Sequence, residues 1–402
     1  MLRIVVLTIG LLASISVYAN FEIEQATINK MVINRQYASA GLYINNRADL
    51  LKEPRFLRQL SHILVTDYTM AISFELFALK DIHDGERLEE LRGAPGTYQL
   101  VGGEWEKVLY EAFQKYPESP DINFAVGEYL SRKEVCSCGN AEYFVGEQAR
   151  DYRYFDLAYK AGIVDYWSLF RIGNHYFRNP GGARQAVFFF LKSLALNPEN
   201  IDANYNIASA YYQIKDYPAA KVYAEKTLGQ YHDASFNADT YVTYARIEAA
   251  LGNHSAAERA YQKAIALKDW DERAFTGLLD IYRTTKRFGE YKQRVAEYIA
   301  LDYSNTYTFN VYVDYLSQAG MVSADREIMR EFALKTFTRP EERGAVFFNL
   351  GRIAEIEKND RVALVYYDKS LAALKELKLP PQGSMEALTQ AISNLEQGGL
   401  KK

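Results

Sequence analysis

The sequence has little of what catalysis and metal binding require. It contains only 2 Cys and 5 His, and no two of the His stand one helical turn apart. Structural zinc normally takes four ligands, so two Cys do not supply an ordinary zinc site. The HExxH motif, the Gly-x-Ser-x-Gly elbow, the Walker loop and the paired-glycine dinucleotide fingerprint are all absent. These absences argue against an enzyme, and we expect no catalytic residues, no metal and no cofactor.

Segments dominated by one sign of charge are also missing. The chain has 47 basic and 51 acidic residues, a formal net charge of −4, and no segment collects Lys and Arg without acidic residues among them. Nucleic-acid-binding proteins carry such basic patches, so we expect no nucleic-acid partner. The acidic residues are scattered along amphipathic stretches, which is typical of solvated helix faces.

Long apolar runs are missing except at the start. A positive charge at Arg3 precedes an apolar run over residues 4–17, and Val17-Tyr18-Ala19 resembles the small-x-small cleavage pattern. These features predict a signal peptide over residues 1–19, cleaved after Ala19. The alternative is a membrane anchor, but the run is shorter than the roughly 18–20 residues of a spanning helix. We expect the periplasm of a bacterium, or release from the cell, with no transmembrane segment after cleavage.

Tyrosine, by contrast, is abundant, with 32 residues. A Tyr ring buries a large area while its hydroxyl stays hydrated, so this content suits both close helix packing and amphipathic binding surfaces.

A helix–turn–helix pattern is clear near the C-terminus. The polar turn Lys358-Asn359-Asp360 separates two helical segments. Their small and aromatic contact positions are Leu350, Gly351 and Ala354 on the first helix and Ala363, Tyr367 and Ser370 on the second. This pattern resembles the tetratricopeptide repeat (TPR), in which a large-Gly-x-x-Tyr element meets Ala-x-x-x-aromatic-x-x-Ala on the next helix.

The same pattern recurs upstream in register. The second-helix anchor positions are Ala186, Ala220, Ala257, Tyr291, Asp325 and Ala363. They are separated by 34, 37, 34, 34 and 38 residues, close to the family period of about 34. A small residue lets the neighbouring aromatic drop between backbones, and each pair exposes an apolar face that only the next pair covers. The repeats predict an all-α, right-handed superhelical, TPR-like solenoid over residues 166–375.

The flanking regions follow the repeat less closely. Residues 20–100 read as a helical N-terminal region, either a divergent repeat or a cap, and the turn-rich stretch 93–103 is the expected internal boundary. Residues 101–165 read as divergent TPR-like repeats with an insertion over 134–150. Residues 382–397 follow helical spacing and predict a terminal capping helix, which repeat arrays need to stay soluble.

The insertion contains both cysteines, Cys136 and Cys138. In an exported protein such a close pair favours a local disulfide or a thiol pair that pinches the loop. The alternative is a redox role or coordination of a soft metal.

The expected binding surface is the inner face of the superhelix, formed by first-helix side chains that point away from the packing seam. By helical spacing these are Phe170, Asn174, Phe177, Tyr205, Ser209, Tyr212, Arg246, Asp280, Arg283, Asn310, Asp314 and Arg352. The alternative for each aromatic ring is a packing role. This surface lacks the Lys/Arg clamp with which some TPR domains grip an acidic C-terminal peptide.

The resemblance implies a non-catalytic scaffold that binds an extended peptide or a protein surface. As a class, the chain resembles exported repeat proteins that assist assembly of envelope or secretion machines, although fold alone does not fix function. Two other classes stay open: a carbohydrate-binding or exopolysaccharide-binding module, and an enzyme with its site in the N-terminal region or the Cys loop. An effector role outside the cell is a further alternative.

Overall fold

The computed structural model describes residues 21–63 with short gaps, 103–136, 141–301, 307–335 and 337–399. The expected signal peptide and most of the expected boundary at 93–103 lie outside the described residues. Cys138 and the side chain of Cys136 also lie outside them, so the disulfide stays a prediction. Across the described ranges the chain is helical and contains no strand, which confirms the predicted all-α class.

The chain divides into two compact units, one ending at Ala210 and the other beginning at Tyr211. The elements of the first unit are η1 (Leu50–Lys52), α3 (Pro54–His62), α7 (Gly103–Lys115), α8 (Pro120–Cys136), η4 (Gly146–Ala149), α9 (Asp151–Lys160), α10 (Tyr166–Arg178), α11 (Ala183–Leu196) and the start of α12 (Ile201–Gln213). The second unit takes the end of α12, then α13 (Tyr217–Glu225), α14 (Ala234–Ala250), α15 (His254–Leu267), α16 (Glu272–Thr284), α17 (Phe288–Ala300), α18 (Tyr307–Ala319), α19 (Ser323–Leu334), α20 (Pro340–Ile356), α21 (Asp360–Lys375) and α22 (Gln382–Gly399).

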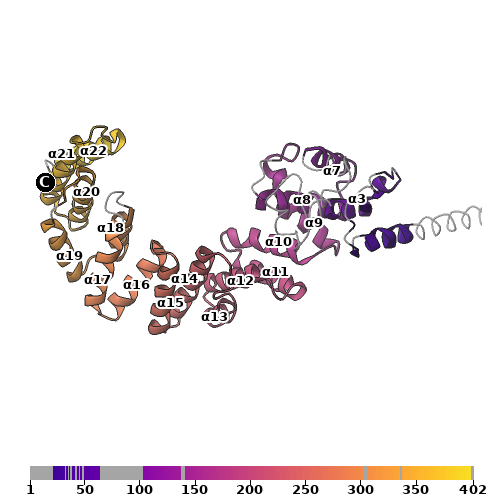
Figure 1. Ribbon diagram of the computed structural model, residues 1–402, viewed down its shortest axis with the longest axis horizontal. Coiled ribbons are helices and arrows are strands. Elements are labelled where there is room, and N and C mark those ends of the chain that lie inside the picture. The colour runs from indigo at the N-terminus through magenta and orange to yellow at the C-terminus, as the bar shows by residue number, and fades with distance from the viewer. Residues whose placement is uncertain are drawn as a thin grey trace, which may run out of the picture. The chain divides into compact units, whose positions relative to one another are not determined.

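Helices pack in consecutive pairs within each unit. The most extensive contacts join α8 to α9, α10 to α11, α14 to α15 and α20 to α21, and each partner lies beside the other in Figure 1. In the second unit one continuous core cluster extends from Ala238 to Ile353. Because this core runs through successive pairs, each pair covers the apolar face of its neighbour, as the predicted solenoid requires.

Glycine allows the two helices of a pair to approach closely. A Cβ placed on Gly173 in α10 would lie 2.6 Å from the ring of Phe190 in α11. The same relation joins α8 to α9, where a Cβ on Gly127 would lie 2.9 Å from the ring of Phe155. The aromatic ring therefore fills the space that a side chain would occupy, as the small–aromatic pattern of the sequence predicts. The pair α8 and α9 therefore shares this glycine–aromatic contact with the pair α10 and α11.

A left-handed residue marks the turn inside each pair of the second unit. The residues are Lys215, Gly252, Lys286, Gly320 and Lys358, with φ between 58° and 81°. Their spacing is that of the second-helix anchors, so the turn has the same place in every repeat. Three of the five positions hold Lys, which adopts this conformation less readily than Gly.

The expectation that the acidic residues occupy solvated faces is wrong at several positions. Glu106, Glu248 and Asp325 are each completely buried. Glu106 accepts hydrogen bonds from the backbone N–H of Tyr143 at 2.7 Å and from Lys133 Nζ at 3.2 Å. The burial of a carboxylate is tolerated where such donors surround it. Glu106 of α7 therefore holds the backbone at Tyr143 and the side chain of Lys133 in α8.

No helix in the described part of the chain has both the length and the apolar character needed to cross a lipid bilayer.

Candidate binding sites

The second unit contains a pocket of about 310 Å³ on its first helices, the Arg246 pocket. It is lined by Tyr212, Arg246, Ala249, Ala250, His254, Tyr261, Gly277, Asp280, Ile281 and Thr284. Small residues make room for it. Gly277 in α16 has no side chain, and the ring of Tyr261 from α15 lies against its backbone.

Arg246 is the exposed cation of this pocket. Its guanidinium carbon lies 4.9 Å from the centre of the Tyr212 ring, within the range of a cation–π interaction. Tyr212 is in turn braced by the ring of Tyr217, with 5.5 Å between centroids. The aromatic ring therefore holds the Arg246 guanidinium at the wall of the pocket.

Further along the same face, on helices α16, α18 and α20, polar side chains form hydrogen bonds and ion pairs with one another. Asp280 accepts a hydrogen bond from the Tyr315 hydroxyl at 2.8 Å. Arg352 Nη2 lies 2.6 Å from Asp314 Oδ1, and its Nη1 donates to Asn310 at 3.3 Å. These contacts join side chains from successive first helices, so the face carries charges of both signs held in defined positions.

Arg283 has a structural role on this face. Its guanidinium donates to the carbonyl oxygens of Ala319 and Gly320, both at 2.9 Å, where helix α18 ends. It also lies 3.7 Å from the buried carboxylate of Asp325. Arg283 therefore caps the C-terminal end of α18, where the helix dipole favours a cation.

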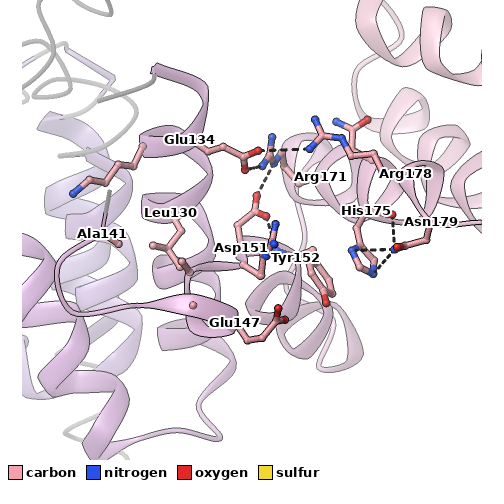
Figure 2. Close-up of a pocket in the computed structure, with 15 residues that line it drawn as sticks. Leu130, Glu134, Ala141, Glu147, Asp151, Tyr152, Arg171, His175, Arg178 and Asn179 are labelled. Atoms are coloured by element: carbon pink, nitrogen blue, oxygen red, sulfur yellow. Dashed lines mark hydrogen bonds and ion pairs between the residues drawn. The ribbon is translucent and has the colours of Figure 1, made fainter. Parts of the chain in front are cut away.

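The first unit contains a larger pocket of about 900 Å³, the Arg171 pocket. Its lining residues are Leu130, Lys133, Glu134, Ala141, Gly146, Glu147, Ala149, Arg150, Asp151, Tyr152, Arg171, Asn174, His175, Arg178 and Asn179. They come from the first helices α8 and α10, from the start of α9, and from the insertion between α8 and α9 (Figure 2).

A three-residue ion cluster forms one side of the Arg171 pocket. Arg171 Nε donates to Asp151 Oδ2 at 2.5 Å, and its Nη2 pairs with Glu134. The side chains of Arg171 and Asp151 are each only 9% exposed. Burial raises the pKa of Asp151, against the opposing effect of the Arg171 charge. A guanidinium held by two carboxylates is fixed in orientation, because its planar fork matches their geometry.

An aromatic pair forms the adjoining side. The Tyr152 and His175 rings stack with centroids 3.4 Å apart and planes 13° from parallel. Asn179 Nδ2 donates to the His175 backbone carbonyl at 2.8 Å and contacts the imidazole. Burial lowers the pKa of His175 below 6.5. The imidazole is therefore mostly neutral near pH 7. The stacking and the Asn179 hydrogen bond hold both rings in place.

The described part of the insertion packs against the core of the first unit. Phe144 is fully buried, with its ring 5.4 Å from Tyr110 and 5.9 Å from Tyr154 between centroids. The backbone N–H of Tyr143 is held by Glu106. The wall that the insertion adds to the Arg171 pocket is therefore supported by the core of the first unit.

The predicted binding residues fall into four groups. Tyr212, Arg246 and Asp280 meet in the Arg246 pocket. Asn174 lines the Arg171 pocket and accepts a hydrogen bond from Asn206 at 2.8 Å. Arg283, Asn310, Asp314 and Arg352 take part in the contacts described above, and Phe177, Tyr205 and Ser209 are half-buried.

Phe170 is the exception. Its ring is 6% exposed and packs against Phe190 with 5.6 Å between centroids. It is a core residue, which was the alternative open for every aromatic ring of the predicted surface.

Sequence reasoning missed the residues that define the Arg171 pocket. Asp151 and Arg171 are 20 positions apart and belong to no repeat motif. The available signal was Arg171 itself, a charge inside the apolar segment 169–172 of a helix, because such a charge is rarely buried without a partner. His175 was one of five isolated His with no characteristic spacing.

Comparison with known proteins gives one family match. Residues 238–269, which span most of α14 and α15, match the tetratricopeptide repeat. Among curated proteins, none matches this chain.

Several solved structures are similar to parts of it. The MamA protein is 19% identical, with a TM-score of 0.35, over 55% of this chain and all of its own. A tetratricopeptide repeat protein from Parabacteroides merdae is 13% identical, with a TM-score of 0.36, over 73% of this chain and all of its own. Yeast Tom70 is 12% identical, with a TM-score of 0.37, over 94% of this chain and 95% of its own.

The matched segment contributes Arg246, His254 and Tyr261 to the Arg246 pocket. The turn of its helix pair has a left-handed residue, Gly252, at the same place as the turns of the pairs before and after it. The comparison therefore identifies a tetratricopeptide repeat at residues 238–269, within a series of helix pairs that the structure shows before and after it.

Proposed function

We propose that this chain is a non-catalytic protein-interaction scaffold of the bacterial envelope, which binds an extended peptide or a protein surface on the first helices of its second unit. TPR proteins bind protein or peptide partners, and stacked repeats create extended surfaces for this purpose. A role in assembling an envelope or secretion machine is the finer part of the proposal.

The observation that carries the proposal is the Arg246 pocket. Tyr212, Arg246 and Asp280 come from three successive first helices, each 34 residues after the last, and line one cavity. An extended chain laid across the helices meets these groups in succession. The aromatic ring offers apolar area, and the charged groups offer hydrogen bonds to backbone or side chains of a partner.

The envelope location rests on the sequence of residues 1–19. Expression in a bacterial host followed by fractionation and intact-mass measurement tests it. We expect a periplasmic or released protein whose mass corresponds to a chain beginning at Asn20. A cytoplasmic product that retains residues 1–19 would contradict export.

A pull-down from bacterial envelope extract, with mass-spectrometric identification and cross-linking, tests the scaffold. We expect one protein at near-stoichiometric yield, cross-linked near α12, α14 and α16. The double variant Tyr212→Ala/Arg246→Ala should weaken that binding at least about tenfold, because an aromatic and an Arg anchor are removed together. Its helical circular-dichroism signal should be unchanged.

Lys263→Ala is the matched control, since it removes an exposed cation from the second helix α15. It should leave binding intact. Recovery of polysaccharide alone, or a partner held equally well by the double variant, would overturn the proposal.

A further inference from the structure

The Arg171 pocket lies in the first unit, and the proposed function, which is placed on the second unit, does not use it. Its volume of about 900 Å³ is near the upper end of the roughly 300–1,000 Å³ typical of ligand sites. Its apolar side chains are few and small, namely Leu130, Ala141 and Ala149. A lipid or another apolar ligand would leave the polar walls without hydrogen-bond partners, which is unfavourable.

The charges of this pocket are closely balanced. Of its basic residues, Arg171 is neutralised by Asp151 and Glu134, and Lys133 pairs at 3.2 Å with Glu106 behind the wall. Arg178 lies 3.7 Å from Glu134. The exposed residues Arg150 and Glu147 add one charge of each sign from the insertion. No single sign dominates, so the pocket attracts neither a polyanion nor a polycation.

An aromatic platform stands among these polar groups. One face of the Tyr152 ring is covered by His175, which fixes the ring at the wall of the cavity. Figure 2 shows Asp151 and Tyr152 close together, with Glu147 below them and Glu134 and Arg178 above them. Carboxylate, guanidinium and amide groups around a fixed ring provide both acceptors and donors.

We propose that the Arg171 pocket binds a neutral oligosaccharide segment. Sugar hydroxyls donate and accept hydrogen bonds, which matches a wall of carboxylates, guanidinium groups and amides. The C–H face of a pyranose ring stacks on an aromatic ring, and Tyr152 supplies that ring. Because Arg171 is held by Asp151, Tyr152 by His175, and the described part of the insertion by Glu106 and the core, few side chains lose freedom on binding.

A glycan array probed with the full chain tests this inference. It carries neutral oligosaccharides of hexose and N-acetylhexosamine units, sulfated and uronic-acid oligosaccharides, and a peptide panel. We expect binding to at least one neutral glycan. In titration calorimetry, Tyr152→Ala should weaken that binding about tenfold, whereas Tyr152→Phe, which keeps the ring, should stay within about threefold.

Glu147→Gln is the second variant, because Glu147 is exposed and its change should not disturb folding. We expect this variant to bind the glycan several-fold more weakly, with an unchanged Tm. Tyr223→Ala, a half-buried Tyr in the other unit, should leave glycan binding unchanged. Absence of binding to neutral glycans, preference for the anionic glycans or the peptides, or neutral-glycan binding that survives both Tyr152→Ala and Glu147→Gln would overturn the inference.

Discussion

Asp325 stands at the second-helix position that holds Ala in several other repeats. Its Oδ1 accepts hydrogen bonds from the hydroxyls of Tyr291 at 2.6 Å and Tyr312 at 2.7 Å. Its Oδ2 accepts from the backbone N–H of Val322 at 2.6 Å. The packing of a small side chain is replaced here by a buried hydrogen-bond network. Burial, together with the neighbouring carboxylate, raises the pKa of Tyr291 and of Tyr312.

Removal of this carboxylate should destabilise the second unit strongly. Asp325→Ala leaves two buried hydroxyls without acceptors, and we expect a loss of about 3 kcal/mol in the free energy of unfolding. Asp325→Asn keeps one acceptor oxygen and should cost less. Urea denaturation followed by circular dichroism measures both. Asp314→Ala, at an exposed carboxylate, should cost at most about 1 kcal/mol, and an equal loss in the two Ala variants would contradict the network.

His175 predicts a pH dependence at the residue scale. Burial lowers its pKa in the folded state, although the Asp151 charge acts in the opposite direction. The unfolded chain therefore binds a proton more readily. The stability linked to this group is present above about pH 6.5 and is lost as the pH falls through the folded-state value. An NMR titration of the imidazole should give a pKa below 6.5.

The stacked Tyr152 ring covers His175 and contributes to this burial. In Tyr152→Ala the pKa should move upward, toward 6.5, because the imidazolium becomes better hydrated. The control Tyr223→Ala should not change it. A His175 that titrates above 6.5 in the unmodified chain would show that the ring pair does not shield it.

At the scale of the helix pair, glycine positions separate packing from propensity. In α20, a Cβ on Gly351 would collide with the ring of Tyr367 in α21, whereas Gly289 in α17 has open space around it. Gly351→Ala should lower the free energy of unfolding by about 1–3 kcal/mol through overpacking. Gly289→Ala should raise it by up to about 1 kcal/mol, because Ala is the better helix former.

Thermal and urea unfolding of the two variants make the comparison, and each serves as the control of the other. Equal effects would mean that helix propensity alone decides the outcome and that the ring of Tyr367 yields. Opposite changes in the free energy of unfolding for the two Gly→Ala variants would show that the close approach of the helices is specific to the repeat position.

At the scale of the whole chain, helix α22 packs against the helix pair that precedes it. Leu388 of α22 is 2% exposed and packs in one cluster with Ala363, Tyr367 and Leu374 of α21. Deletion of residues 382–399 should expose this apolar surface, lower the Tm and promote self-association, since terminal repeats need a polar outer face. Scanning calorimetry and size-exclusion chromatography measure the two effects. An unchanged, monomeric truncated chain would show that α22 does not act as a cap.

The repeat architecture could be predicted from the sequence because its determinants are local and periodic. A small residue such as Gly173, an aromatic such as Phe190 and a polar turn recur at fixed offsets, and each offset has the same consequence in every copy. The positions of Tyr212, Arg246 and Asp280 on one face follow from the same periodicity. For these features, the repeat pattern in the sequence is enough to predict the helix pairs and the face on which a side chain lies.

Tertiary structure alone decided which side chains converge outside the repeat. Glu134, Asp151 and Arg171 lie on the three helices α8, α9 and α10 and meet where these helices pack, with α8 and α9 in close contact at Gly127 and Phe155. The burial of Phe170, and of Asp325 between two Tyr, likewise depends on neighbours far away in the chain. Local periodicity fixes the direction of a side chain, whereas burial and partners depend on long-range packing, which no single-repeat pattern contains.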